Sequence, residues 1–190
     1  MGAVTAYWRL IRDNHNFRKL WLAQVVSEIG DWFYALAIYN LLLELTGKAS
    51  LVGVAVVLQV LPQTLIAPTA GVLNDRIRRK RVMIAADLVR VVIVMGMLLV
   101  RTPAMIWLVF PLLFLESAMA AFFEPARSSV LPNITEPRDL LRANTLASAT
   151  WCLNLAIGAT LGGVAGALLG RDAVFLLNAA SFLEIGRAHV

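Results

Sequence analysis

Four polar residues lie in an otherwise apolar run and share one side of a helix. Gln24, Ser27, Glu28 and Asp31 are spaced i, i+3, i+4 and i+7, which places them on one helical face. A charged carboxylate facing lipid costs on the order of 2.5–3.5 kcal/mol, so this face is predicted to line an aqueous cavity. Loss of surrounding water favours the protonated form of a carboxyl group. The pattern makes Asp31 and Glu28 candidates for proton coupling, and Gln24 and Ser27 candidates for contact with substrate.

Two other apolar runs contribute three more polar residues. Gln59 and Gln63 stand one helical turn apart, and Glu116 lies deep within its own run. Such groups are tolerated at membrane depth where they face protein or a water-filled cavity. Glu116 is therefore a third proton-coupling candidate, and Gln59 and Gln63 are predicted to line the cavity. For all of these residues the alternative is that they only hydrogen-bond neighbouring helices and fix their packing.

Metal and covalent chemistry have little material in this chain. It holds one cysteine, Cys152, and two histidines, His15 and His189, at opposite ends. These residues do not give the ligand spacing of a zinc or iron–sulfur site, and the apolar runs contain no Ser/His/Asp set. We therefore expect no metal, no cofactor and no enzymatic activity.

The elements that must position these residues are membrane-spanning helices. Of the 190 residues, 59% are apolar and 15% charged, whereas soluble domains are about half apolar and a quarter charged. A crossing needs about twenty residues. The sequence predicts an all-α polytopic bundle over residues 20–183, after a cytoplasmic segment at 1–19, with five full spans and a truncated sixth. Their bounds are about 20–45, 51–73, 82–100, 105–123, 145–169 and, truncated, 173–183.

Three local patterns refine this bundle. Gly158, Gly162, Gly166 and Gly170 recur every fourth residue and predict a groove that packs against another helix. Residues 124–144 contain three prolines and are predicted to form a surface strap. Asp87 and Arg90 are three residues apart and are predicted to form an ion pair within the membrane.

The string at 184–190 resembles the translation of a sequencing-library adapter and is predicted not to be native.

The basic residues are distributed unequally between the two sides of the predicted membrane. Cytoplasmic segments are rich in Lys and Arg. If the amino terminus is cytoplasmic, its side receives Arg9, Arg12, Arg18, Lys19, Arg76, Arg78, Arg79, Lys80, Arg81, Arg127, Arg138 and Arg142, while the other side receives Lys48, Arg101 and Arg171. This asymmetry predicts a cytoplasmic amino terminus. It also accounts for the net charge of +5 without a nucleic-acid partner, and it favours contact with membrane lipid.

The loop between the second and third runs resembles the signature loop of the major facilitator superfamily. Gly71 is followed after three residues by Asp75 and Arg76, and then by a basic cluster that includes Arg79 and Lys80. The segments 82–90, 122–127 and 158–163 are similar to the branch that contains macrolide and other drug exporters. This resemblance implies the amino-terminal half of a major facilitator fold, with Gly71, Asp75, Arg76, Arg79 and Lys80 as a gating loop.

The function implied is secondary transport through a bacterial-type inner membrane. We expect proton-coupled efflux of an amphipathic small molecule by alternating access, as in drug-resistance antiporters, with the missing carboxyl-terminal half as partner. Two alternatives remain open: a lipid, lysolipid or siderophore permease of the same fold, and a membrane scaffold subunit that does not transport. A scaffold would need no acids within the membrane.

Overall fold

A computed structural model of the chain describes residues 3–188; the side chains of residues 3, 4, 75, 159, 165, 167 and 184–188 are outside the description. The described residues contain no strand. The α-helices are α1 (Ala3–Asp13), α2 (His15–Thr46), α3 (Ala49–Arg76), α4 (Arg79–Met97), α5 (Val109–Ile134), α6 (Leu140–Leu169) and α7 (Arg171–Ala188), and the 3₁₀ helix η1 (Pro103–Leu108) precedes α5. The predicted all-α fold is confirmed.

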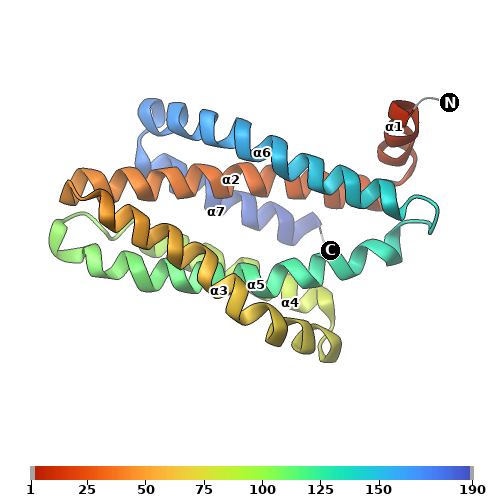
Figure 1. Cartoon of the computed structure of the whole chain (residues 1–190), viewed down its shortest axis with the longest axis horizontal. Helices are drawn as coiled ribbons and strands as arrows, with labels where there is room; N and C mark the ends of the chain where they lie inside the picture. Colours follow the sequence, from red (N-terminus) through yellow and green to blue (C-terminus); the bar gives the residue numbers. More distant parts are fainter. Residues whose placement is uncertain (1–2, 189–190) are drawn as a thin grey trace.

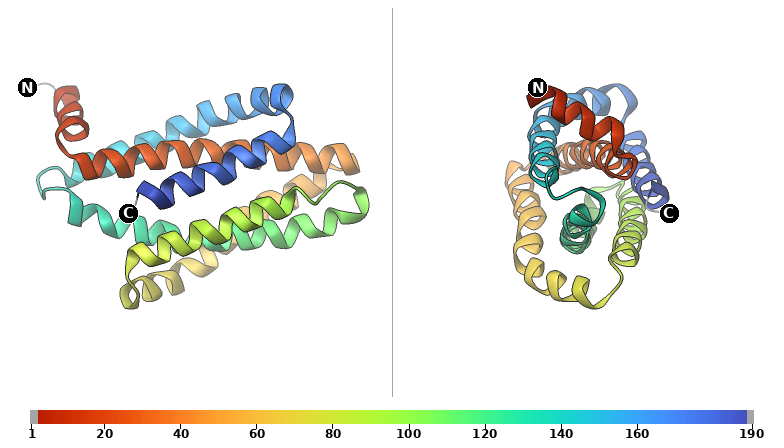
Figure 2. Two further views of the ribbon diagram at one scale, coloured as in Figure 1. Left: turned by 180° about the vertical axis from the view of Figure 1, so that it is seen from behind. Right: turned by 90° about the vertical axis from the view of Figure 1, so that its right-hand side faces the viewer.

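Helices α2 to α7 run along one axis, and α1 crosses that axis at one end of the bundle (Figures 1 and 2). The main pairings join α3 to α5 and α2 to α6, and α4 and α7 pack against each other and against this frame. One end of the bundle holds α1, the α3–α4 turn and the α5–α6 connection. The elbow between α1 and α2 lies at this end too, and the opposite end holds the α2–α3, α4–α5 and α6–α7 connections (Figures 1 and 2). Successive helices from α2 to α7 run in opposite directions along this axis. Of these successive pairs, α4 and α5 pack extensively, whereas α2–α3, α3–α4, α5–α6 and α6–α7 touch over only a small area.

The apolar surface of the bundle agrees with a bilayer as its solvent. Three helical stretches are long and apolar enough to cross a membrane: Ala49–Asn74, Pro103–Ile134 and Leu140–Val164. Helices α2 and α4 lie beside them and carry the charged residues that lower their own hydropathy. Large apolar side chains such as Val57, Val60 and Leu65 of α3 are exposed, as expected where the surroundings are acyl chains or a partner protein and not water.

The connection predicted at 124–144 is mostly helical, which corrects the expectation of a surface strap. Helix α5 continues through Pro125 and Pro132 to Ile134, and α6 begins at Leu140. Each proline removes one backbone donor, but neighbouring helices in a membrane bundle hold the turns on either side. Only residues 135–139 connect the two helices. Helix α5 is therefore long enough to carry Glu124 and Arg127 on its inner face.

Other helix bounds differ by smaller amounts. Helix α4 covers Arg79–Met97 where 82–100 was predicted, and α2 begins at His15, before the predicted residue 20. The last helix extends to Ala188, beyond the predicted end at 183. Residues 189–190 lie outside the described part of the chain. The prediction that 184–190 is not native is untested and stays a prediction.

The glycine groove of α6 packs against α2 at two of its four positions. A Cβ atom on Gly158 would lie 2.9 Å from Cβ of Trp32, and one on Gly162 would lie 3.2 Å from Cα of Phe33. Gly166 has only a distant neighbour at 3.9 Å. Gly170 does not pack: it ends α6 with φ of +78°, a left-handed region that glycine adopts readily. The packing prediction is thus wrong for Gly170.

Adding one methyl group to this groove should destabilise the protein. We expect Gly158→Ala to lower the free energy of unfolding by about 1–3 kcal/mol, the usual effect of overpacking, because the Trp32 atom in its way sits next to the backbone. Gly163→Ala is the matched control, since no atom lies within 4 Å of its added Cβ. It should be neutral, or stabilising by up to about 1 kcal/mol through helix propensity. Thermal unfolding in detergent, followed by circular dichroism, measures both; equal effects would contradict the packing.

Candidate functional site

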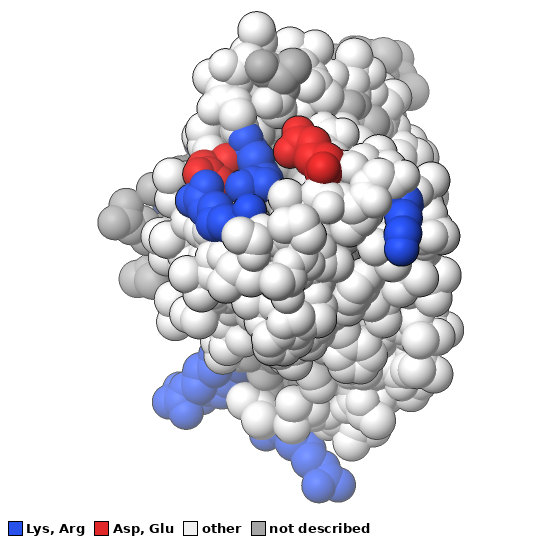
Figure 3. Space-filling view, turned by 90° about the vertical axis from the view of Figure 1, so that its left-hand side faces the viewer, with Lys and Arg blue, Asp and Glu red and all other residues white. Residues whose placement is uncertain are grey.

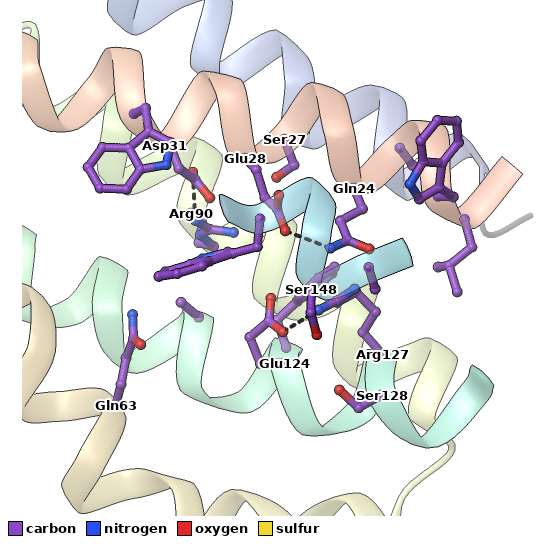
Figure 4. A pocket seen from close by; sticks show the side chains of 18 of the residues that line it. Gln24, Ser27, Glu28, Asp31, Gln63, Arg90, Glu124, Arg127, Ser128 and Ser148 are labelled. Carbon is purple, nitrogen blue, oxygen red and sulfur yellow. Dashed lines mark hydrogen bonds and ion pairs between the residues drawn. The ribbon is translucent and has the colours of Figure 1, made fainter. Parts of the chain in front are cut away.

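The polar face of α2 lines a cavity of about 720 Å³. Its walls come from α2, α3, α5 and α6, and Arg90 of α4 reaches it from behind (Figure 4). All seven residues predicted for proton coupling or substrate contact border this cavity: Gln24, Ser27, Glu28, Asp31, Gln59, Gln63 and Glu116. The structure therefore brings together residues from three separate helices that sequence analysis had singled out one by one.

Arg90 forms the most buried ionic contact of the cavity wall. Its Nε donates to Oε1 of Glu116 at 2.8 Å, and its Nη2 donates to the same oxygen at 2.6 Å and to Oδ1 of Asp31 at 2.9 Å. The guanidinium carbon also lies 3.9 Å from the centre of the Phe182 ring, within the range of a cation–π contact. One side chain of α4 is thus bound to α2, α5 and α7, and it is only 4% exposed.

The predicted ion pair between Asp87 and Arg90 is wrong. Both carboxylate oxygens of Asp87 are buried and have no hydrogen-bond partner among the described atoms, while Arg90 bonds to Asp31 and Glu116. An i, i+3 pair on one helix contributes only about 0.2–0.5 kcal/mol. Two carboxylates presented by neighbouring helices give the guanidinium a stronger set of charge-assisted bonds.

Glu28 has a different environment from Asp31. Its carboxylate accepts hydrogen bonds from two neutral amides, Nε2 of Gln24 at 2.7 Å and Nδ2 of Asn154 at 2.8 Å. No basic side chain of the described residues lies within ion-pair distance of it. The two acids of the α2 stripe are therefore distinct. Asp31 is paired with a buried cation, while Glu28 is hydrogen-bonded to two amides and feels the charge of Arg127 from beyond ion-pair distance.

The glutamines of α3 face the cavity from the other side. Gln59 accepts a hydrogen bond from the Tyr39 hydroxyl at 2.5 Å, so it contributes to packing between α2 and α3 as well as to the cavity wall. Gln63 is exposed and points toward the cavity (Figure 4). Gln59 thus both borders the cavity and bonds to a neighbouring helix, whereas no hydrogen bond to another helix is found for Gln63 among the described residues.

Several cavity residues were missed from the sequence. Glu124 and Arg127 form an ion pair at 2.7 Å on α5 and border the cavity, and Asn154 of α6 binds Glu28. Ser128, Asn144 and Ser148 complete this wall. The sequence does show the i, i+3 spacing of Glu124 and Arg127. Their segment was predicted to be a connection outside the bundle, so they were not considered as cavity residues. Cys152, the single cysteine, is exposed and also lies on the cavity wall.

The predicted gating loop is the turn between α3 and α4. Gly71 and Arg76 belong to α3, and Arg79 and Lys80 to α4. Nη1 of Arg79 donates to the Ser129 carbonyl oxygen at 2.6 Å, which joins the turn to α5. Arg76 and Lys80 are exposed. The side chain of Asp75, the acid of this predicted gating loop, is outside the described residues.

The cavity combines carboxylates, guanidinium groups and amides with aromatic side chains. Trp21, Trp32 and Trp151 line it beside the acids, so it offers both charge and apolar area to a bound molecule. The described residues contain no group of three or more His, Cys, Asp or Glu placed to hold a metal ion. The cavity can therefore contact both the polar and the apolar parts of a small molecule.

Comparison with known proteins agrees with this arrangement. A family model described as transmembrane secretion effector matches residues 6–188. The chain belongs to the major facilitator superfamily. It is 31% identical over 160 residues to macrolide efflux protein A of Streptococcus pyogenes, which is 81% of this chain and 38% of that protein.

Two further relatives are the uncharacterized MFS-type transporters YfiS and YkuC of Bacillus subtilis. YfiS is 26% identical over 91% of this chain and 41% of its own length, and YkuC is 27% identical over 93% and 41%. No solved structure matches. The major facilitator chain described here thus spans about two fifths of the length of these curated relatives. Its six-helix bundle α2–α7 is a partial major facilitator fold.

The Arg90 cluster predicts a large and specific stability effect. Arg90→Met should lower the free energy of unfolding by about 3–5 kcal/mol, because it leaves two acids without their buried cation. Arg101→Met is the matched control: its pair with Asp172 at 2.6 Å is exposed, and exposed pairs contribute about 0–1 kcal/mol. Adding Asp31→Asn and Glu116→Gln to Arg90→Met should recover much of the loss. Unfolding in detergent solution measures all three; an Arg90→Met protein as stable as the Arg101→Met protein would contradict the cluster.

Proposed function

We propose that this chain forms the amino-terminal half of a transporter that exports amphipathic organic compounds, driven by inward proton flow, by alternating access. The convergence of Asp31, Glu28 and Glu116 on one cavity carries this proposal. Acids at membrane depth are costly and are retained where they bind an ion, a proton or a substrate. Their gathering around a cavity large enough for an organic molecule supports transport more than packing alone.

Asp31 is the acid best placed to couple protons to movement. Its side chain is 37% exposed, so water in the cavity reaches it, while one oxygen binds Arg90. A proton on Asp31 removes its charge and weakens this bond. Because Arg90 also holds α5 and α7, the protonation of Asp31 would bias how α2 sits against the rest of the bundle. That is the link that a proton-driven transporter requires.

Glu28 and the surrounding tryptophans support an amphipathic substrate. The Glu28 carboxylate, held by Gln24 and Asn154, offers its charge to a positive group on the substrate. The aromatic faces nearby suit apolar or cationic parts of the same molecule. Binding of such a substrate and protonation of the acids would oppose each other, which is the competition that antiport needs. One of the relatives, macrolide efflux protein A, is by its name an exporter of an organic compound, which supports this class of substrate.

The turn between α3 and α4 would act as the gate latch. Arg79 already anchors it to α5, and the acid at Asp75 would pair with basic groups or a helix end in the second half of the transporter. The amino terminus would be cytoplasmic in a bacterial-type inner membrane, as the distribution of Lys and Arg predicts. The cavity would then open and close between two halves that rock against each other.

A second half is required by this mechanism. Residues 1–190 alone should not transport, because rocking-bundle transport places the substrate between two halves and this chain supplies one. Cells that produce the chain alone, and cells that produce it with the carboxyl-terminal half of its transporter, are compared for loss of a preloaded fluorescent substrate. Gradient-dependent efflux is expected only in the second case. Robust flux from residues 1–190 alone would overturn the proposal.

The roles of the individual acids can be distinguished by replacing each with its amide in the complete transporter. Asp31→Asn should abolish efflux driven by the proton gradient, while Glu28→Gln should raise the substrate concentration for half-maximal efflux roughly tenfold, the equivalent of about 1.4 kcal/mol. Glu44→Gln is the matched control, since Glu44 lies on the same helix but is exposed near its far end. Efflux in inverted vesicles with an imposed pH gradient measures each variant.

These variants also test the alternatives. Full tolerance of Asp31→Asn, Glu28→Gln and Glu116→Gln would contradict proton coupling and favour a scaffold subunit. Loss of phospholipid uptake in the same variants, with organic-cation efflux unchanged, would instead favour a lipid permease.

A further inference from the structure

The first helix is set apart from the bundle. Helix α1 runs across the direction of α2, beside the start of α6 (Figures 1 and 2). Asn14 forms the elbow between α1 and α2 in an extended backbone conformation, and its side chain accepts from the Phe17 N–H at 2.9 Å. Its Nδ2 also donates to the Ile134 carbonyl oxygen at 2.6 Å. The elbow is thus anchored to the end of α5, and α1 itself packs against α2 and α6, transverse to the membrane-spanning helices.

Two large apolar side chains of α1 differ in how far the bundle covers them. Leu10 is 6% exposed, whereas Trp8 is 65% exposed. Two residues separated by two positions on a helix of 3.6 residues per turn point in nearly opposite directions, about 160° apart. Leu10 therefore docks α1 against the bundle, and Trp8 projects from another side. An indole ring is amphipathic and is enriched where an apolar layer meets water.

A basic residue accompanies the exposed indole. Arg12 follows Trp8 by four positions, so the two lie one turn apart on the same side of α1, and Arg12 is exposed. The same end of the bundle carries further exposed basic side chains: Arg9, Lys19, Arg76, Arg78, Lys80 and Arg81.

The opposite end of the bundle differs in charge. There Arg101 and Arg171 both approach Asp172, at 2.6 and 3.6 Å. Figure 3 looks onto this end and shows charged side chains only in small groups. The positive surplus of the molecule is therefore concentrated at the end where α1 lies, which is where it would meet anionic headgroups.

We propose that α1 is an interfacial helix that lies in the headgroup layer of an anionic bilayer, with Trp8 at the boundary of the acyl chains and Arg12 bound to lipid phosphates. The transverse direction, the exposed indole and the adjacent guanidinium are the features by which amphipathic helices bind membrane surfaces. The inference does not depend on the transport function, since it concerns only how the chain sits in lipid.

The test uses residues 1–190 reconstituted in nanodiscs of phosphatidylcholine, with or without phosphatidylglycerol. Hydrogen exchange of the α1 amides is expected to be slower with phosphatidylglycerol. Arg12→Glu should reduce this protection roughly five- to thirtyfold, because each basic group near an anionic surface contributes about fivefold and reversal adds repulsion. Lys48→Glu, the same charge change on an exposed residue at the opposite end, should leave it unchanged. The exchange of α2–α7 serves as the control for folding.

A second measurement locates the indole. Brominated phosphatidylglycerol quenches tryptophan fluorescence on contact, so wild-type protein should lose more signal than Trp8→Phe, and more with bromine placed near the headgroup than deep in the chain. Equal quenching of the two proteins, or α1 protection that is the same in both lipids, would overturn the proposal. Protection that arises only when a carboxyl-terminal half is present, in either lipid, would overturn it too and would make α1 a contact between halves.

Discussion

A guanidinium group inside a membrane bundle is the constraint on which the rest of this structure depends. Arginine does not lose its proton in proteins, so Arg90 cannot become neutral and must be matched by anions where the dielectric constant is low. Asp31 supplies one from α2 and Glu116 another from α5. The Phe182 ring of α7 covers the guanidinium. Four helices are therefore held in register by one side chain, and the cavity is the space left in front of it.

The cavity acids differ because their partners differ. Asp31 shares Arg90 with Glu116, so two negative charges divide one positive charge. Glu28 is instead stabilised by amide dipoles from Gln24 and Asn154. Asp31 is thus joined through a buried cation to α4, whereas Glu28 is joined to α6 through a neutral amide. This difference between the two acids follows from the groups that donate hydrogen bonds to their carboxylate oxygens, and it requires no conformational change.

Sequence analysis predicted the stripe on α2 because helical periodicity alone decides which residues share a face. It also predicted Glu116, since an acid in a long apolar run is conspicuous wherever it points. Sequence analysis could not predict that Arg90 pairs with Asp31 and Glu116 and not with Asp87, because distances between helices depend on how whole helices pack. Pro125 and Pro132 suggested an end to α5, but a proline removes a single hydrogen bond and neighbouring helices compensate.

The glycines show the same limit at smaller scale. Four-residue spacing predicted that Gly158 and Gly162 pack against another helix, and the structure shows that this helix is α2. The spacing could not tell that Gly170 would end α6 with a positive φ. Gly30, with no such pattern, makes the closest approach among the glycines that the structure describes: an added Cβ would lie 2.7 Å from Oδ1 of Asn178 on α7. The close contact at Gly30 depends on the residues of α7 that pack against it, so it cannot be predicted from the sequence around Gly30.

The position of Cys152 has a practical consequence. It is the one thiol of the chain, and it stands on the wall that faces the buried guanidinium and the acids. A water-soluble maleimide would therefore modify a single site on the cavity wall. The rate of this reaction would measure how accessible the cavity is to water. The molecule carries its own reporter of access, with no engineered label required.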